Sequence, residues 1–184
     1  MLVLAGFAAA SAVLAASAWS GGRAGSPPLH LPHIAHGARC PVSRPDNCVP
    51  FVTRFGVGVG IGKGPAYPVG LPTGVLQLAP AQNFDSRNWA GQKVLWFVLP
   101  GYRGPVLVRG ARIDAPGRVR FQRGDVPPLR LRITRSTAEP GTPVPTDARY
   151  VPSYTRVRGP GCYAYQIDGT SFSRVVVFRT VWTS

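Results

Sequence analysis

Proline and glycine interrupt this chain so often that a helical fold is excluded. The 184 residues include 22 glycines and 20 prolines. After residue 18, no window of roughly 11 residues or more shows helical periodicity without one of them. Short apolar runs separated by turn residues are typical of a sheet protein instead. The sequence therefore predicts an all-β fold, a two-layer antiparallel β-sandwich.

The predicted strands are short runs with either continuous apolar character or alternation. They cover residues 94–99, 105–109, 118–122, 129–134, 162–167 and 170–181, with a Pro/Thr-rich loop over 136–153. In the third and fourth strands, alternation directs inward the side chains of Val119, Phe121, Leu129, Leu131 and Ile133. Asp168-Gly169 predicts a two-residue hairpin turn, because both residues tolerate positive φ. Such a turn pairs Tyr165 with Phe172 and Tyr163 with Arg174.

The first 18 residues have the pattern of a secretory signal peptide. They are apolar and uncharged, and they close on Ala16-Ser17-Ala18, a small-residue cleavage pattern. Cleavage there makes Trp19 the mature amino terminus; the alternative is an uncleaved anchor, because no Lys or Arg precedes the apolar run. Residues 19–39 are rich in Gly, Ser, Pro and His and predict a flexible arm, followed by a sandwich domain over 40–184. The predicted location is secreted or associated with the cell envelope.

Three cysteines would meet an oxidising environment after export. With Cys40, Cys48 and Cys162, we expect one disulfide and one leftover thiol, and three pairings are open. Cys40 with Cys48 would close a short local loop. Either of them with Cys162 would tie the amino-terminal arm to the last hairpin and remove more chain entropy from the unfolded state.

The carboxyl-terminal stretch carries a hairpin signature. Residues 160–173 read PGCYAYQIDGTSFS, and VVVF follows at 175–178. Together with CPVS at 40–43 and GPVLVRG at 104–110, this stretch resembles small exported bacterial proteins of uncharacterised function. The resemblance implies export and brings no particular activity. Gly161-Cys162-Tyr163 is also similar to the start of the tyrosine-corner strand of immunoglobulin-like sandwiches, which implies an Ig-like architecture.

Catalytic and cofactor motifs are hard to place in this sequence. All three histidines lie in the predicted arm, at His30, His33 and His36, so no histidine base follows for a Ser or Cys nucleophile. No Asp, Glu or Cys lies between the histidines, and no metal site is predicted. The glycine-rich segment 56–64 lacks the spacing of a phosphate loop, so neither a nucleotide nor another cofactor is predicted.

Arginine dominates the charge of the chain. The net charge is +14, with 21 Lys and Arg against 7 Asp and Glu. A GC-rich coding sequence explains such a composition without any function, whereas attraction to polyanions is the functional interpretation. If strands 118–122 and 129–134 lie in one sheet, four outward arginines share a face, namely Arg118, Arg120, Arg130 and Arg132. These four residues are the predicted anion-binding site.

The sequence favours a non-catalytic binding domain over two alternatives. The expected partner is an anionic envelope polymer or a surface protein, and nucleic acid is not expected outside the cell. An extracellular hydrolase would use aspartate side chains, but Asp125 and Asp168 lie beside glycine, in contexts typical of turns. A structural or assembly component would pair with another protein through its edge strands.

Overall fold

Nine strands and one short 3-10 helix form the described part of the computed structural model, residues 28–46, 58–71, 73–137 and 147–183. The strands are β1 (Ala66–Val69), β2 (Val75–Leu78), β3 (Ala90–Val98), β4 (Val106–Arg112), β5 (Arg120–Phe121), β6 (Leu131–Ile133), β7 (Arg149–Val157), β8 (Gly161–Asp168) and β9 (Ser173–Trp182). The 3-10 helix, η1 (Ala81–Phe84), lies between β2 and β3. No helix in these ranges is long and apolar enough to cross a membrane. The predicted signal peptide, 1–18, and Cys48 lie outside the described residues.

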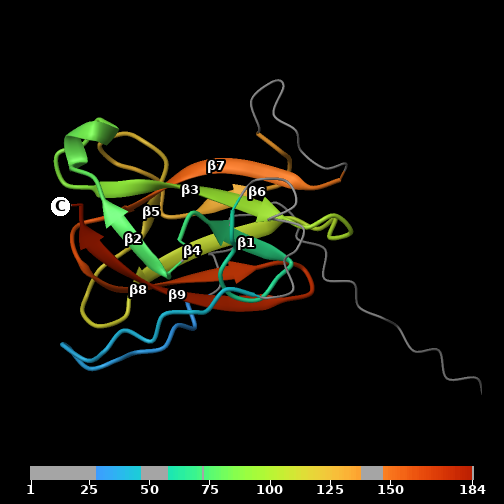
Figure 1. The fold of residues 1–184 in the computed structure, drawn as a ribbon. Helices are drawn as coiled ribbons and strands as arrows, with labels where there is room; N and C mark the ends of the chain where they lie inside the picture. Colours follow the sequence, from blue (N-terminus) through green and yellow to red (C-terminus); the bar gives the residue numbers. More distant parts are fainter. Residues whose placement is uncertain (1–27, 47–57, 72, 138–146, 184) are drawn as a thin grey trace, which may run out of the picture.

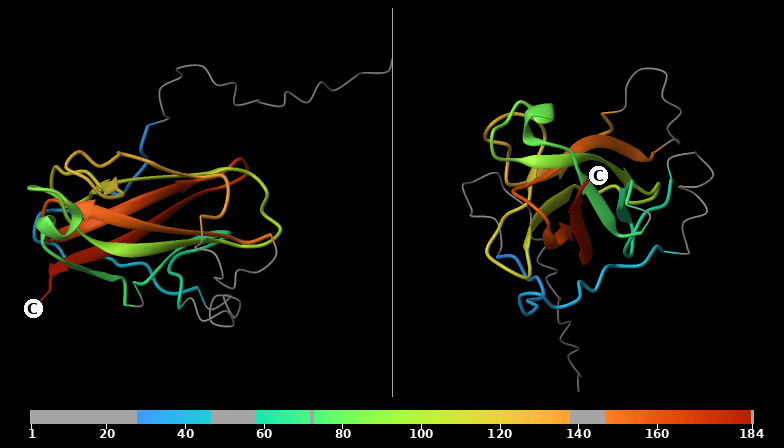
Figure 2. Two further views of the ribbon diagram at one scale, coloured as in Figure 1. Left: turned by 90° about the horizontal axis from the view of Figure 1, so that it is seen from above. Right: turned by 60° about the vertical axis from the view of Figure 1, so that its left-hand side comes forward.

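Two sheets pack face to face (Figures 1 and 2). The four-stranded sheet has the order β1-β3-β7-β5, and the five-stranded sheet has the order β2-β9-β8-β4-β6. All strand pairs are antiparallel except β2 with β9. The predicted all-β, two-layer sandwich is confirmed, with one parallel pair at the edge of the larger sheet. The immunoglobulin-like assignment stays a prediction.

Aromatic side chains fill the space between the sheets. Trp96 of β3, Tyr165 of β8 and Phe178 of β9 are fully buried. The rings of Tyr165 and Phe178 stack with their centroids 4.3 Å apart, and Trp96 meets Tyr165 edge-on at 5.1 Å. The Tyr163 hydroxyl donates to the carbonyl of Gly159 at 2.9 Å, the kind of upstream backbone contact that a tyrosine corner makes. This aromatic core fixes the two sheets against each other.

The two arginine-bearing strands do not share a sheet, so that prediction is wrong. β5 pairs with β7 in the four-stranded sheet, whereas β6 pairs with β4 in the five-stranded sheet. The chain changes sheet just before β5: Arg118 bridges to Ala111 of β4, and the Val119 amide donates to the Gly110 carbonyl at 3.1 Å. Among the five predicted inward residues, four are buried, but Leu129 is 42% exposed.

The hairpin between β8 and β9 has a longer turn than predicted. Asp168 pairs with Ser173, and residues 169–172 form the turn. The observed partners are Val176 for Tyr165 and Phe178 for Tyr163, in place of the predicted Phe172 and Arg174. The carboxylate of Asp168 explains the difference, because it is held at the strand end by the side chains of Arg109, Gln166 and Ser173.

The described part of the predicted arm lies against the five-stranded sheet. From Pro28 the chain runs along the outer face of this sheet, beneath β8 and β9 in Figure 1. The Ile34 amide donates to the carbonyl of Ile113 at 2.9 Å, and Leu31 and Ile34 pack on a small apolar cluster of that face. The flexible arm stays a prediction for residues 19–39; within the described part, Leu31 and Ile34 are partly buried against the apolar surface of the sheet.

Candidate functional site

One end of the four-stranded sheet carries a buried arginine on its outer face. Arg156 of β7 has an exposed fraction of 0%. Its Nε donates to the carbonyl of Trp89 at 3.0 Å, as does Nη2, and Nη1 donates to the carbonyls of Gln122 at 3.0 Å and Phe84 at 3.4 Å. Burial lowers the pKa of Arg156 to about 10, so the side chain is a cation at neutral pH. This cation ties two loops to the sheet through backbone oxygens.

Gly91 of β3 makes room for this arginine. The strand register places Gly91 directly opposite Arg156. A Cβ atom at this position would lie 2.4 Å from the Thr155 carbonyl oxygen and 2.7 Å from Cδ of Arg156. Only glycine therefore lets the guanidinium pass across β3 to the carbonyl of Trp89.

Trp89 holds two further arginines beside its ring. The guanidinium carbon of Arg120 lies 4.8 Å from the ring centroid and that of Arg158 lies 5.0 Å away, so the two carbons are at most 9.8 Å apart. Arg120 Nη1 donates to the carbonyl of Pro127 at 2.6 Å, while Arg120 Nε is buried without a partner among the described residues. Arg158 is exposed. Cation–π contacts fix the positions of both charges without neutralising them.

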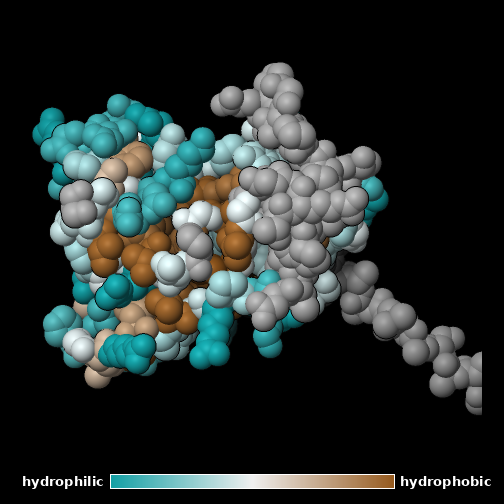
Figure 3. All heavy atoms as spheres, in the orientation of Figure 1, coloured by the Kyte–Doolittle hydropathy of each residue, from teal (hydrophilic) through white to brown (hydrophobic). Residues whose placement is uncertain are grey.

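The segments 81–91, 118–128 and 154–158 form a strongly cationic region, termed here the arginine end. It contains six arginines and two aspartates, namely Arg87, Arg118, Arg120, Arg123, Arg156, Arg158, Asp85 and Asp125. Figure 3 shows hydrophilic side chains gathered over η1 at this end. Asp85 pairs with Arg123 at 3.1 Å, and Asp125 accepts a bond from the Arg87 amide at 3.2 Å. Among the described residues, no carboxylate forms an ion pair with Arg118, Arg120 or Arg158.

The structure divides the four predicted anion-binding residues between two places. Arg118, which is exposed, and Arg120, which is half-buried, belong to the arginine end. Arg130 and Arg132 are exposed beside and within β6 of the other sheet. The neighbours that the sequence analysis did not identify are Trp89, Arg156 and Arg158. The spacing of Arg156 and Arg158, two residues apart, is a signal in the sequence for two arginines on one face of a strand. The Pro/Thr-rich composition of the preceding residues favours a loop instead and hides this signal.

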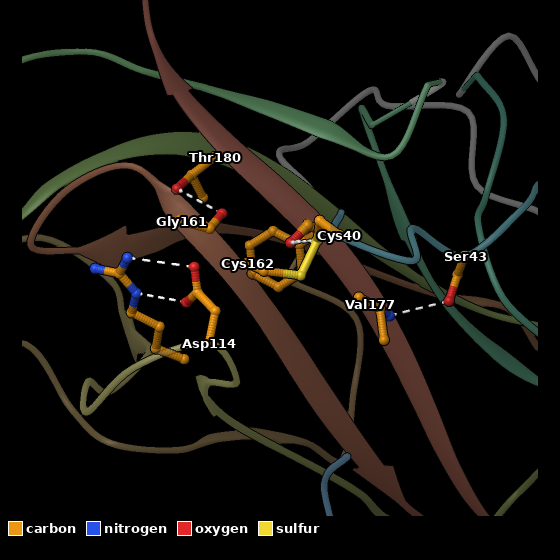
Figure 4. The surroundings of a disulfide bond; sticks show 9 residues. Cys40, Ser43, Asp114, Gly161, Cys162, Val177 and Thr180 are labelled. Carbon is orange, nitrogen blue, oxygen red and sulfur yellow. Dashed lines mark hydrogen bonds and ion pairs between the residues drawn. A yellow bond between two sulfur atoms is a disulfide. The ribbon is translucent and has the colours of Figure 1, made fainter. Parts of the chain in front are cut away.

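The second candidate region surrounds a disulfide on the outer face of the five-stranded sheet. Cys40 is bonded to Cys162 of β8, with their Cα atoms 5.5 Å apart, which confirms one of the three open pairings. Figure 4 shows the disulfide beside Val177 of β9. Ser43, three residues after Cys40 in the arm, forms hydrogen bonds with the backbone of Val177. The Ser43 amide donates to the Val177 carbonyl, and the Ser43 hydroxyl accepts from the Val177 amide, both at 2.9 Å. The arm is thus attached covalently and by hydrogen bonds.

Asp114 lies close to the disulfide and forms an ion pair with a neighbouring arginine. Its Oδ1 is 2.6 Å from Nε of Arg112 (Figure 4). Burial alone would raise the pKa of Asp114, but hydrogen bonds from Arg112 and from the Cys162 backbone lower it below its ordinary value of 3.8. The carboxylate is therefore charged and paired.

A groove of about 660 Å³ opens beside the disulfide. Its walls come from arm residues 38–42, from 73–75 before and within β2, from the turn and strand start at 160–162, and from 179–181 of β9. Asp114 lies at its border. This volume is within the range of small-molecule sites.

The other described aspartates are engaged by neighbouring groups. Burial would raise the pKa of Asp168, but hydrogen bonds from Arg109, Gln166 and Ser173 lower it. Asp147 pairs with Arg103 at 2.8 Å, and Asp46 accepts from the Tyr67 hydroxyl at 3.0 Å. Lowered pKa values favour charged carboxylates, the opposite of what a general acid needs. In the described part of the chain, no three His, Cys, Asp or Glu side chains gather as metal ligands.

No family model, no curated protein and no solved structure matches this chain. The chemistry of the arginine end and of the disulfide region therefore carries the functional interpretation.

Proposed function

We propose that this chain is an exported, non-catalytic domain that binds anionic polymers of the cell envelope through its arginine end. The observation that carries the proposal is the pair of guanidinium groups beside Trp89, at most 9.8 Å apart and without a carboxylate partner among the described residues. The planar guanidinium suits the oxygens of phosphate and carboxylate groups. A charged polymer presents several such groups in series, so more than one arginine can bind one chain.

The arginine end is preorganised for this binding. Arg156 donates to the carbonyl of Trp89, so the residue that carries the other two charges is itself anchored to the sheet. The stacked guanidinium of Arg120 loses little further freedom when it binds an anion. Preorganised charges bind more tightly because less side-chain entropy is lost on association.

Export is supported by the signal-peptide pattern of residues 1–18, by the resemblance to small exported proteins and by the Cys40–Cys162 disulfide. A disulfide persists in oxidising compartments, where envelope polymers are the polyanions within reach. The intact mass of secreted protein tests this part of the proposal. Cleavage predicts a chain that begins at Trp19, whereas the full-length chain in the membrane fraction would indicate an anchor.

The polymer site is tested with two matched double variants of the purified protein. Arg120→Gln with Arg158→Gln removes the two charges beside Trp89, and Arg130→Gln with Arg132→Gln removes two charges from the region of β6. The probes are sodium polyphosphate and poly-L-glutamate, titrated over a series of salt concentrations. For nucleic acids the log–log salt slope is about −0.7 to −0.9 per phosphate contact. We expect the first variant to flatten the slope by about one to two contacts, and the second to leave it nearly unchanged.

Two results would overturn the proposed site. Equal loss of binding in both double variants would mean that net charge, rather than the arginine end, attracts the polymer. Unchanged binding in the first variant would remove Arg120 and Arg158 from the interface. Association of envelope material that does not depend on salt would instead favour pairing through edge strands.

A further inference from the structure

The groove beside the disulfide has apolar walls and charged borders. Three valines, one each from the arm, β2 and β9, line it together with the disulfide: Val42, Val75 and Val181. The Thr180 hydroxyl, also in the lining, donates to the Gly159 carbonyl at 3.1 Å and is therefore occupied. The interior offers apolar surface to a ligand more than hydrogen-bonding groups.

The charges that line the groove are predominantly positive. Arg39 of the arm and Arg179 of β9 are both exposed and both line it. Among the described residues of the lining, Asp114 is the one acidic residue, and Arg112 already pairs with it at 2.6 Å. Two cations at the border of an apolar groove are complementary to a molecule with an anionic group and an apolar body.

We propose that this groove binds small amphipathic anions, with the apolar body against the valines and a carboxylate or phosphate group at Arg39 and Arg179. Both headgroups present oxygens that a guanidinium recognises through paired hydrogen bonds. Burial of the apolar body removes its methylene groups from water, so the apolar body supplies much of the affinity. The two cations of this site, Arg39 and Arg179, do not belong to the arginine end.

The disulfide makes this site dependent on oxidation. One wall of the groove consists of residues 38–42, which Cys40 fixes to β8 through Cys162. The opposite wall belongs to the sheet itself, through residues 179–181. Breaking the disulfide frees one wall relative to the other, so the oxidised protein is the binding form.

Calorimetric titration of the purified oxidised protein tests the proposal with four probes, each below its aggregation concentration. Dodecanoate and dodecyl phosphate distinguish the two headgroups, dodecyltrimethylammonium reverses the charge, and acetate removes the apolar body. We expect at least one of the two amphipathic anions to bind. The cationic amphiphile and acetate should each bind at least about tenfold more weakly, because each lacks one half of the interaction.

Variants locate the site. Arg39→Gln with Arg179→Gln should weaken binding of the amphipathic anion about tenfold or more, since hydrogen bonds to charged groups are the stronger ones. Arg132→Gln with Arg135→Gln, an equal change of charge at exposed positions elsewhere, should leave it unchanged. Cys40→Ser with Cys162→Ser should abolish binding. If this variant fails to fold, the arginine pair alone still decides the question.

Three outcomes would overturn the proposal: no binding of either amphipathic anion, equal binding of the cationic amphiphile, or unchanged binding in the Arg39 and Arg179 variant. Polyphosphate binding by the same variants separates this inference from the proposed function. Loss of dodecanoate binding with intact polyphosphate binding supports the groove, whatever the fate of the arginine end.

Discussion

The two outer faces of the sandwich are covered by different chemistry. On the four-stranded sheet, η1 and the loop at 122–124 are held by one buried cation, Arg156, which bonds to backbone carbonyls. On the five-stranded sheet, the arm is held by a covalent bond and by apolar contacts. Attachment through Arg156 requires several backbone carbonyls arranged around one guanidinium. Attachment of the arm requires only that the sulfur atoms of Cys40 and Cys162 lie within bonding distance. The first face should therefore respond to side-chain substitution and the second to reductant.

The faces also differ in how they use charge. On the five-stranded side, Arg109 pairs with Asp168 at 2.8 Å and Arg112 with Asp114 at 2.6 Å. At the arginine end, Arg120 and Arg158 lie beside an aromatic ring without a carboxylate among the described residues. The two pairs on the five-stranded side hold elements of the fold together, whereas the guanidinium groups beside Trp89, like those of Arg39 and Arg179 at the groove, can bind an anion. Two guanidinium groups fixed over one aromatic ring are the reason why polymer binding is proposed for the arginine end.

The largest expected effect comes from removing the disulfide. The two cysteines are separated by 122 residues in sequence. In the chain-entropy model, closing a loop of this size stabilises the folded state by about 5 kcal/mol at 25 °C. Cys40→Ala with Cys162→Ala should lower the free energy of unfolding by that order, measured by urea denaturation.

Hydrogen exchange of the disulfide variant sharpens the comparison between the faces. The amides of Ile34 and Ser43, which bond to the five-stranded sheet, should lose protection. The Gly124 amide, which bonds to Phe84 at the arginine end, should keep it. Equal loss at all three amides would show that the two coverings are not independent.

The next largest effect is expected at Arg156. Arg156→Met keeps an unbranched apolar stem but removes the guanidinium, which leaves the carbonyls of Trp89 and Gln122 without their donor. The expected cost is about 3 kcal/mol, because buried carbonyl groups are left unsatisfied. Arg156→Lys should recover part of this loss through one remaining donor group. Gly124 should lose protection and Ile34 keep it, the reverse of the disulfide variant.

The strands that the sequence predicts well are those with a regular inward pattern. The runs 94–99 and 162–167 lie within or beside β3 and β8, because apolar residues there alternate or run continuously. β7 falls partly in the predicted 136–153 loop because Pro152 breaks its pattern and Ser153 and Thr155 point inward. Its Ser and Thr side chains carry no apolar signal, although both are buried.

The candidate site could be predicted only in part. Alternation correctly directs Arg132 outward between two buried residues, and it places Arg118 at the surface. It cannot show that β5 and β6 belong to different sheets, because a change of sheet at 118–119 depends on long-range pairing with β4. The cysteine pairing is likewise long-range, so spacing in the sequence leaves it open.

A smaller effect is expected for Gly91→Ala. The new Cβ would lie 2.4 Å from the carbonyl oxygen of Thr155 and 2.7 Å from Cδ of Arg156, and both residues are fully buried. Overpacking of this kind costs about 2 kcal/mol. Gly159→Ala is the matched control, because nothing lies within 4 Å of its Cβ position. A similar loss of stability in both variants would contradict the role of Gly91 as the passage for Arg156.

The smallest effect concerns acid and the five-stranded side. The pKa values of Asp114 and Asp168 are lowered from 3.8, so both carboxylates stabilise the folded state fully above that ordinary value. Their contribution is lost as the pH falls through the lower folded-state pKa values, because the unfolded chain then binds protons first. Asp114→Asn should cost less than about 1 kcal/mol at pH 7, as partly exposed pairs do, and its difference from the parent should close as the pH falls below the ordinary value of 3.8 and through the lowered folded-state pKa. Asp85→Asn, at an ion pair whose carboxylate is 71% exposed, should show little change at either pH. Both variants are measured by urea denaturation at several pH values. If the free energy of unfolding depends on pH in the same way in both, the exposed pair of Asp85 contributes as much as the more buried pair of Asp114. Acid sensitivity would then not be a property of the five-stranded side.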